Sequence, residues 1–112
     1  MRSNTDAFAA DLDALSTQAK ALSHPARLAI LQTLAARTEC VCGDIVDDLP
    51  LAQSTVSRHL KVLKEAGLVQ GTVDGPRVCY CLDDAGVSAL RTRFADFFAD
   101  LDRPGASAEA CR

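Results

Sequence analysis

The spacing of apolar residues changes abruptly at Gly67 in this 112-residue chain. Before the glycine, apolar residues recur at steps of four and three, which predicts a helix over residues 53–66 that the glycine ends. After it, the helical period is lost, and residues 68–73 and 77–82 read as strands. An Asp-Gly-Pro segment separates these two runs, and Asp-Gly between apolar runs is typical of a β-hairpin. The chain is therefore expected to place a helix directly before a two-stranded hairpin.

The segments before residue 53 extend this arrangement. A helix is expected to begin after Ser23, which suits the N-cap, with Pro25 in a first turn where no backbone hydrogen bond is lost. Residues 39–41 are too few for a helix and are expected to form a short strand. Residues 43–49 predict a two-turn helix that Pro50 stops. Two consecutive short helices joined by a tight turn and followed by a hairpin describe a winged helix-turn-helix, a mainly α fold with a small β-hairpin.

Amphipathic helices are expected at both ends of this unit. Apolar residues recur at steps of three and four along residues 8–22 and again along residues 87–101. These stripes are similar to coiled-coil seams and predict a homodimer formed by both terminal helices. The alternative is that each stripe only covers the core of its own domain. We expect one domain over residues 1–101 and a disordered tail over residues 102–112.

Composition and charge limit where the protein acts and what it binds. No apolar run approaches the roughly 18 residues of a membrane span, and the N-terminal segment lacks the apolar core of a signal peptide. We therefore expect a cytoplasmic protein with no membrane partner. The formal net charge is -3, but residues 51–82 carry four Lys or Arg against two Asp or Glu. A local basic patch attracts a phosphate backbone whatever the total charge, so the middle of the chain is expected to bind DNA.

The helix over residues 53–66 is the candidate DNA-reading element. In a helix-turn-helix the second helix enters the major groove, and its first turns meet the base edges. Gln and Arg can bond bases in bidentate fashion, hydroxyls can bond bases or phosphates, and lysines contact the backbone. The candidate DNA-binding residues are Gln53, Ser54, Thr55, Ser57, Arg58, His59, Lys61, Lys64 and, beside the hairpin tip, Arg77. His59 fits base contact and packing equally, and the alternative for the whole set is an ordinary solvated helix.

Four of the five cysteines form two C-x-C pairs, Cys40/Cys42 and Cys79/Cys81, while Cys111 is alone near the end. Reduced cysteines at short spacing in a cytosolic protein indicate metal or redox chemistry. Side chains at i and i+2 share one face of a strand, and the short strand before the helix pair commonly joins the hairpin as a third strand. We therefore expect Cys40 and Cys42 to share a site with Cys79 or Cys81 across the sheet. The alternative is that these cysteines fill space as small apolar residues.

Three stretches of the chain closely resemble the ArsR/SmtB family of metal-responsive repressors. They are LSHPARLAILQTLA, ECVCGDIVDDLPLAQSTVSRHLKVLKEAGLV and GTVDGPRVCYCLD, and the resemblance covers about residues 19–84. It implies a homodimer that binds a pseudo-palindromic operator in double-stranded DNA with no cofactor. It also implies that an effector weakens this binding and releases transcription of a resistance operon.

The E-C-V-C-G-D stretch resembles the cysteine motif of the family's arsenite and cadmium/lead sensors, which assigns Cys40 and Cys42 to the ligand set. The arsenic type has a third cysteine where this chain has Ile45. The last helix lacks the histidine of the family's zinc site, and no cysteine precedes Cys40 as the cadmium/lead type requires. The expected inducer is therefore As(III), followed by Sb(III) and methylated arsenicals. The hairpin cysteines or Cys111 could supply a third thiolate.

Other functions fit parts of the pattern. A redox-responsive repressor would oxidise one of its cysteine pairs without any ion, and a Cd/Pb-responsive repressor of the same family would use other soft ions. A constitutive DNA-binding module would make no use of its cysteines. An enzyme is not expected, because the chain has no C-x-x-C motif and no Ser/His/Asp set stands out.

Overall fold

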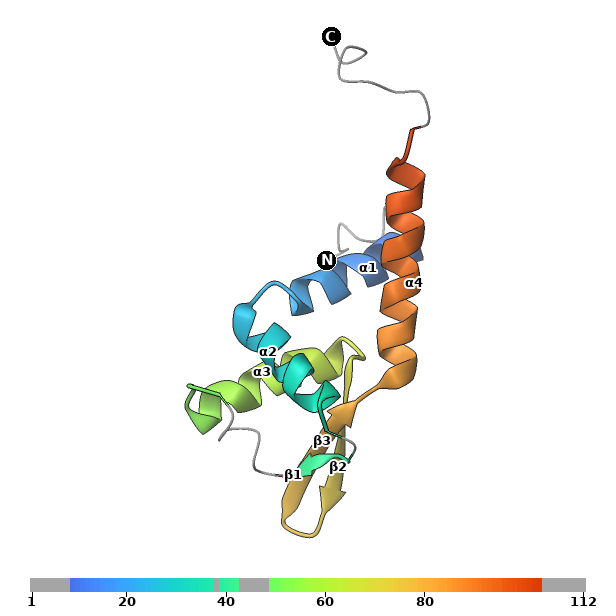
Figure 1. Cartoon of the computed structure of the whole chain (residues 1–112). Coiled ribbons are helices and arrows are strands. Elements are labelled where there is room, and N and C mark those ends of the chain that lie inside the picture. The colour runs from blue at the N-terminus through green and yellow to red at the C-terminus, as the bar shows by residue number, and fades with distance from the viewer. Residues whose placement is uncertain (1–8, 38, 43–48, 104–112) are drawn as a thin grey trace, which may run out of the picture.

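The computed structural model describes residues 9–37, 39–42 and 49–103. Their elements, in order, are α1 (Ala10–Ala21), α2 (Pro25–Ala35), β1 (Val41–Cys42), α3 (Gln53–Glu65), β2 (Val69–Asp74), β3 (Arg77–Leu82) and α4 (Asp84–Leu101) (Figure 1). This is the expected mainly α fold with a small hairpin. Residues 43–48 of the helix expected over 43–49, nearly all of the tail and Cys111 lie outside the described residues. No described helix is long and apolar enough to cross a membrane.

Strands β2 and β3 form the hairpin, which we call the wing. Its antiparallel ladder runs from Val69 opposite Leu82 to Asp74 opposite Arg77. Gly75 lies in the turn with φ +62°, a left-handed conformation that glycine adopts without steric cost. The ladder therefore closes through a two-residue turn of Gly75 and Pro76, and Asp74, expected in the connection, belongs to β2 instead.

The short strand β1 joins the wing as its third strand, and the sheet order is β1-β3-β2. Val41 lies opposite Tyr80, and Cys42 lies opposite Cys79. The strand expected over residues 39–41 is thus shifted toward the C-terminus, because the residues that find backbone partners on β3 are Val41 and Cys42. The expected three-stranded topology is confirmed.

The core lies between helices α2 and α3 and the sheet. Ile30 of α2 and Leu63 of α3 are 0% exposed, and Leu68, just before β2, is 1% exposed. Val56 and Leu60, the other predicted inward residues of α3, are buried as well. Because residues at steps of four and three cover one side of a helix, the other side of α3 is left to solvent.

Helix α2 is capped by His24 and not by Ser23. The Nδ1 atom of His24 accepts a hydrogen bond from the backbone N–H of Ala26 at 3.0 Å. The hydroxyl of Ser23 instead donates to the carbonyl of Lys20 at 2.7 Å, at the end of α1. The expectation that Ser23 is the N-cap is therefore wrong, because its side chain is used by the preceding helix.

Helices α1 and α4 pack together at the end of the molecule away from the wing (Figure 1). Nη1 of Arg93 on α4 donates to Oε1 of Gln18 on α1 at 3.0 Å, and Gln18 is buried. The later turns of α4 extend beyond α1, and Phe98 is 61% exposed there. The terminal helices thus cover part of the core and also present apolar side chains to solvent.

Candidate DNA interface and cysteine site

The solvent side of α3 gathers the predicted DNA-reading residues. Its exposed residues include Gln53, Ser54, Ser57, Arg58, Lys61 and Lys64, while Thr55 and His59 are half-buried. Ala52 at the N-cap provides no side-chain acceptor for the first amide groups of the helix. Those N–H groups therefore add to the positive potential of the exposed face, which suits a phosphate.

The wing adjoins this face of α3. A Cβ atom placed on Gly71 of β2 would lie 3.3 Å from Nζ of Lys64, so the lysine side chain covers the base of the wing. Arg77 follows the wing turn and is exposed. Lys64 of α3 is therefore a direct neighbour of the wing, and Arg77 lies at the turn end of the wing.

His59 contacts helix α2. Its ring centroid lies 4.5 Å from that of His24, and its Nδ1 atom lies 3.2 Å from Nη1 of Arg27. Arg27, whose role could not be read from its sequence position, also donates from Nε to the carbonyl of Ala21 at 2.8 Å. Burial, followed by the charges of His24, Arg27 and Arg58, lowers the pKa of His59 below its ordinary value of 6.5. These contacts favour packing as the role of His59.

The lowered pKa of His59 predicts a loss of stability in mild acid. In the folded state the ring gives up its proton more readily than in the unfolded chain, so the unfolded chain binds more protons once the pH falls below 6.5. The free energy of unfolding should therefore decrease as pH falls through that value and level off below the folded-state pKa. Denaturant titrations between about pH 5 and 8 would measure this. A His59→Gln variant should lose this component, and an unchanged pH slope would assign it to other groups.

Two of the predicted ligand cysteines meet across the sheet. Cys40, which directly precedes β1, and Cys81 of β3 are joined by a disulfide with a Cα–Cα distance of 4.5 Å, although 41 residues separate them in sequence. Cys79 is 5% exposed, and its backbone partner on β1 is Cys42. The two C-x-C segments therefore lie side by side, as the sequence predicts. The Cys40–Cys81 pair is oxidised, whereas reduced thiols were expected.

The described residues hold no group of three or more His, Cys, Asp or Glu placed to bind a metal ion. A hollow of about 690 Å³ lies beside the Cys40–Cys81 pair, between the end of α2, strand β3 and the start of α4. Leu34, Arg37 and Asp83 are among the residues that line it. The pair is therefore open to small molecules from solvent, and a third ligand from the described residues is not preassembled around it.

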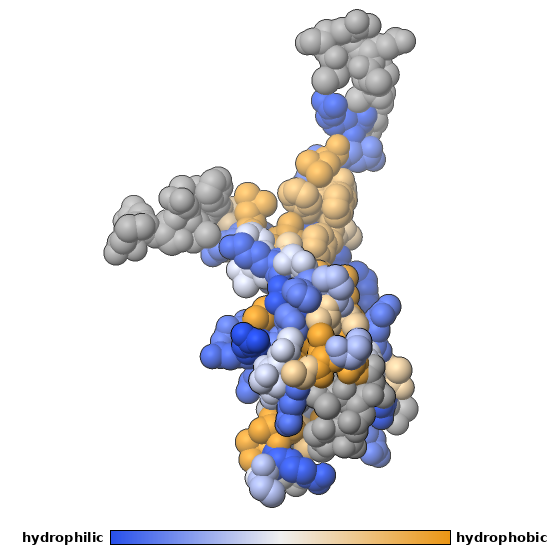
Figure 2. All heavy atoms as spheres, turned by 90° about the vertical axis from the view of Figure 1, so that its left-hand side faces the viewer, coloured by the Kyte–Doolittle hydropathy of each residue, from blue (hydrophilic) through white to orange (hydrophobic). Residues whose placement is uncertain are grey.

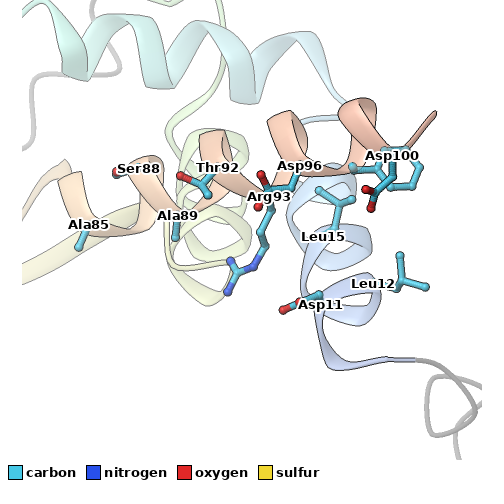
Figure 3. A pocket seen from close by; sticks show the side chains of 11 residues that line it. Asp11, Leu12, Leu15, Ala85, Ser88, Ala89, Thr92, Arg93, Asp96 and Asp100 are labelled. Carbon is cyan, nitrogen blue, oxygen red and sulfur yellow. The ribbon is translucent and has the colours of Figure 1, made fainter. Parts of the chain in front are cut away.

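A second hollow, of about 660 Å³, lies between α1 and α4 (Figure 3). Leu12 and Leu15 of α1 line one side, and Arg93 and Phe97 of α4 line the other. Figure 2 shows hydrophobic residues along the upper part of the molecule as well as near its lower end. Large apolar side chains exposed on the two helices are Leu12 (45%), Phe98 (61%) and Leu101 (56%). A second copy could bury apolar area on this surface, although large apolar side chains of α2, α3 and the wing are exposed as well.

Comparison with known proteins matches both the sequence and the fold. Residues 22–72 match a family described as "Helix-turn-helix domain". The chain is 44% identical over 84 residues to the HTH-type transcriptional regulator Rv2034 of Mycobacterium tuberculosis, which covers 75% of this chain and 71% of that protein.

Two solved structures extend the match. One, titled a possible transcriptional regulator for arsenical resistance, has 34% identity and a TM-score of 0.64, over 73% of this chain and 84% of its own. The other is the homodimeric winged helix-turn-helix DNA-binding domain Mb0332 of Mycobacterium bovis, a possible ArsR-family regulator. It has 28% identity and a TM-score of 0.63, over 94% of this chain and 97% of its own. The chain thus shares its fold with solved regulators of transcription, one of which is a homodimeric DNA-binding domain.

Proposed function

Because the chain belongs to the ArsR/SmtB family of helix-turn-helix transcriptional regulators, we propose that it is a homodimeric repressor that leaves its operator when its cysteines bind trivalent arsenic. Like the relatives that it matches, it is a DNA-binding regulator and not an enzyme. The proposal places it in the cytoplasm, where thiols stay reduced. The observation that carries the sensing part is the contact between Cys40 and Cys81 across β1 and β3.

The proposed DNA contact uses the exposed face of α3 and the wing. Arg58 and Gln53 are placed on that face where bidentate bonds to bases are possible, and Lys61 and Lys64 follow for the backbone. In a dimer, two such helices must be separated by about 34 Å to enter successive major grooves. The homodimeric winged-helix neighbour and the exposed apolar residues of α1 and α4 support this assembly.

The proposed inducer site is built on the same pair of cysteines in its reduced form. Two side chains that can form a disulfide also hold their sulfurs close enough to share one thiophilic ion. Each thiol that binds arsenous acid replaces one hydroxyl group and releases one water molecule, so no oxidant is needed. Soft thiolates suit such ions, and Cys79 or Cys42 on the neighbouring positions could supply a third sulfur. The neighbour titled a possible regulator for arsenical resistance supports arsenic as the ion.

Operator binding by the fully reduced protein, titrated with arsenite, tests the proposal. We expect release by arsenite and antimonite, and weaker responses to cadmium and zinc. A coupling of about 1–3 kcal/mol between two sites corresponds to a roughly 5–150-fold fall in affinity. Cys40→Ser and Cys81→Ser should keep operator affinity and lose this response. Cys111→Ser should keep both when the third sulfur comes from the sheet, and its loss of the response would assign the third thiolate to Cys111. If the reduced protein stays on its operator at saturating arsenite, antimonite and cadmium, the proposal that it senses these ions is wrong. The proposal that it binds DNA would be unaffected.

A redox-responsive repressor is the second candidate, and the disulfide between Cys40 and Cys81 favours it. In that case the two thiols would lose two protons and two electrons to an oxidant of the peroxide class, which is reduced to water while the S–S bond forms. Peroxide would then release the operator, and arsenite under strict reduction would not. Both reagents acting through the same two cysteines would mean that one sulfur pair serves two signals.

A further inference from the structure

The C-terminal end of α3 is closed by a Schellman motif around Gly67. The N–H of Leu68 bonds to the carbonyl of Leu63, and the N–H of Gly67 bonds to the carbonyl of Lys64, both at 3.0 Å. Gly67 adopts φ +79°, which a residue with a side chain would rarely accept. This turn therefore fixes the direction of the chain between the end of α3 and the start of β2.

The first turn of α4 rests directly on that turn (Figure 1). A Cβ atom on Gly86 would overlap the carbonyl oxygen of Gly67, so only glycine allows the two backbones to approach this closely. Asp83 holds Gly86 in place, because its Oδ1 atom accepts the N–H of Gly86 at 3.0 Å. The N–H of Asp83 in turn donates to the carbonyl of Leu68 at 3.0 Å. Residues 67–68 and 83–86 thus form one tightly packed junction.

This junction lies one residue away from the cysteine site along the chain. Cys81 is followed by Leu82 and then by Asp83, which caps α4. Because one residue, Leu82, separates Cys81 from Asp83, a displacement of Cys81 by a ligand or a bond to Cys40 would reach the backbone N–H of Asp83, which bonds to Leu68. α4 carries the proposed dimer surface, and the turn at Gly67 ends the proposed DNA-reading helix, so the junction connects all three functional parts.

We infer that the contact between Gly86 and Gly67 positions α3 relative to α4 and transmits the state of the cysteines to the DNA-reading helix. This inference rests on the proposed function, since it assigns a route to the proposed response. Neither glycine touches DNA or the ligand; both act by setting the angle of α3. A sub-ångström displacement suffices, because closely packed backbone has no free space in which to absorb it.

The Gly86→Ala variant tests the inference. Its added methyl group must push α4 away from the carbonyl of Gly67, which should tilt α3 out of its operator-binding position. We expect effector-free Gly86→Ala to bind operator as weakly as arsenite-treated wild type. Arsenite should leave the affinity of this variant unchanged, whereas coupled sites typically change it by roughly 5–150-fold. Fluorescence anisotropy with operator DNA, with and without arsenite under reduction, measures both quantities. Ala95→Ser, an exposed substitution on the same helix, is the matched control and should behave as wild type.

Variants of Asp83 provide a second test if Gly86→Ala fails to fold. Asp83→Ala removes the acceptor that holds Gly86 without adding any atom and should lower the arsenite response, whereas Asp83→Asn keeps a capping oxygen and should restore it. A merely structural role would reduce thermal stability and leave the ratio of affinities with and without arsenite unchanged, and that result would overturn the inference. If wild type itself does not respond to arsenite, the sensing proposal fails. The effector-free affinity of Gly86→Ala then still decides whether the junction positions α3.

Discussion

Replacing Phe98 with aspartate is expected to yield a folded monomer that binds operator DNA about 10²–10⁴-fold more weakly than wild type, the range by which linkage of two binding modules usually raises affinity. Phe98 is 61% exposed on α4, so its substitution removes little from the core of the single chain. It lies three residues before the exposed Leu101 on the same helix, and a negative charge at this position would be costly to bury against the apolar side chains of a second copy. Analytical ultracentrifugation would measure the mass, and operator titration would measure the affinity.

Two matched variants separate loss of the dimer from loss of the fold. Phe98→Leu keeps an apolar side chain at the position and should remain dimeric. Leu28→Asp adds the same charge at a similarly exposed apolar residue of α2, away from the terminal helices, and should also remain dimeric. A dimeric Phe98→Asp protein with native operator affinity would show that the dimer interface lies on another surface and does not use this part of α4.

The positions of the helices and the wing follow from local rules that the sequence displays. Helix α4 contains the whole predicted apolar stripe of residues 87–101, and α3 differs from its predicted range by one residue at its end, because an unbroken apolar period marks both. The wing also agrees within one residue, since an Asp-Gly pair sets the register of a hairpin. β1 and the cap of α2 were placed less well. The position of β1 is decided by its pairing with β3, and the cap of α2 is decided by the competing hydrogen bond from Ser23 to Lys20.

The approach of the two C-x-C segments could be predicted, because a third strand beside β3 brings residues of both onto one sheet. The pairing of Cys40 with Cys81 could not, since strand bounds must be known to within one residue to choose between alternative partners. The contact between Gly67 and Gly86 could not be predicted from the sequence either. A glycine in the first turn of a helix signals a close backbone approach, but the sequence does not identify the segment that approaches.

The Arg58→Ala variant is expected to lose discrimination between operator and unrelated DNA. Arg58 is exposed on α3 two positions after Val56, whose burial turns the neighbouring polar residues outward. A good bidentate contact between arginine and a guanine contributes about 1–3 kcal/mol of discrimination, and a dimer loses two such contacts at once. Operator affinity should therefore fall by more than tenfold, while affinity for a scrambled duplex changes little. Both affinities can be measured by anisotropy at several salt concentrations.

Lys61→Ala is the matched control, since Lys61 is exposed on the same helix and is assigned to the phosphate backbone. A lost phosphate contact weakens operator and scrambled DNA alike and lowers the slope of log affinity against log salt by about one. Arg58→Ala should lower specific binding with a smaller effect on nonspecific binding. Equal losses on both duplexes for both variants would mean that the exposed side of α3 follows the backbone, and that another element reads the bases.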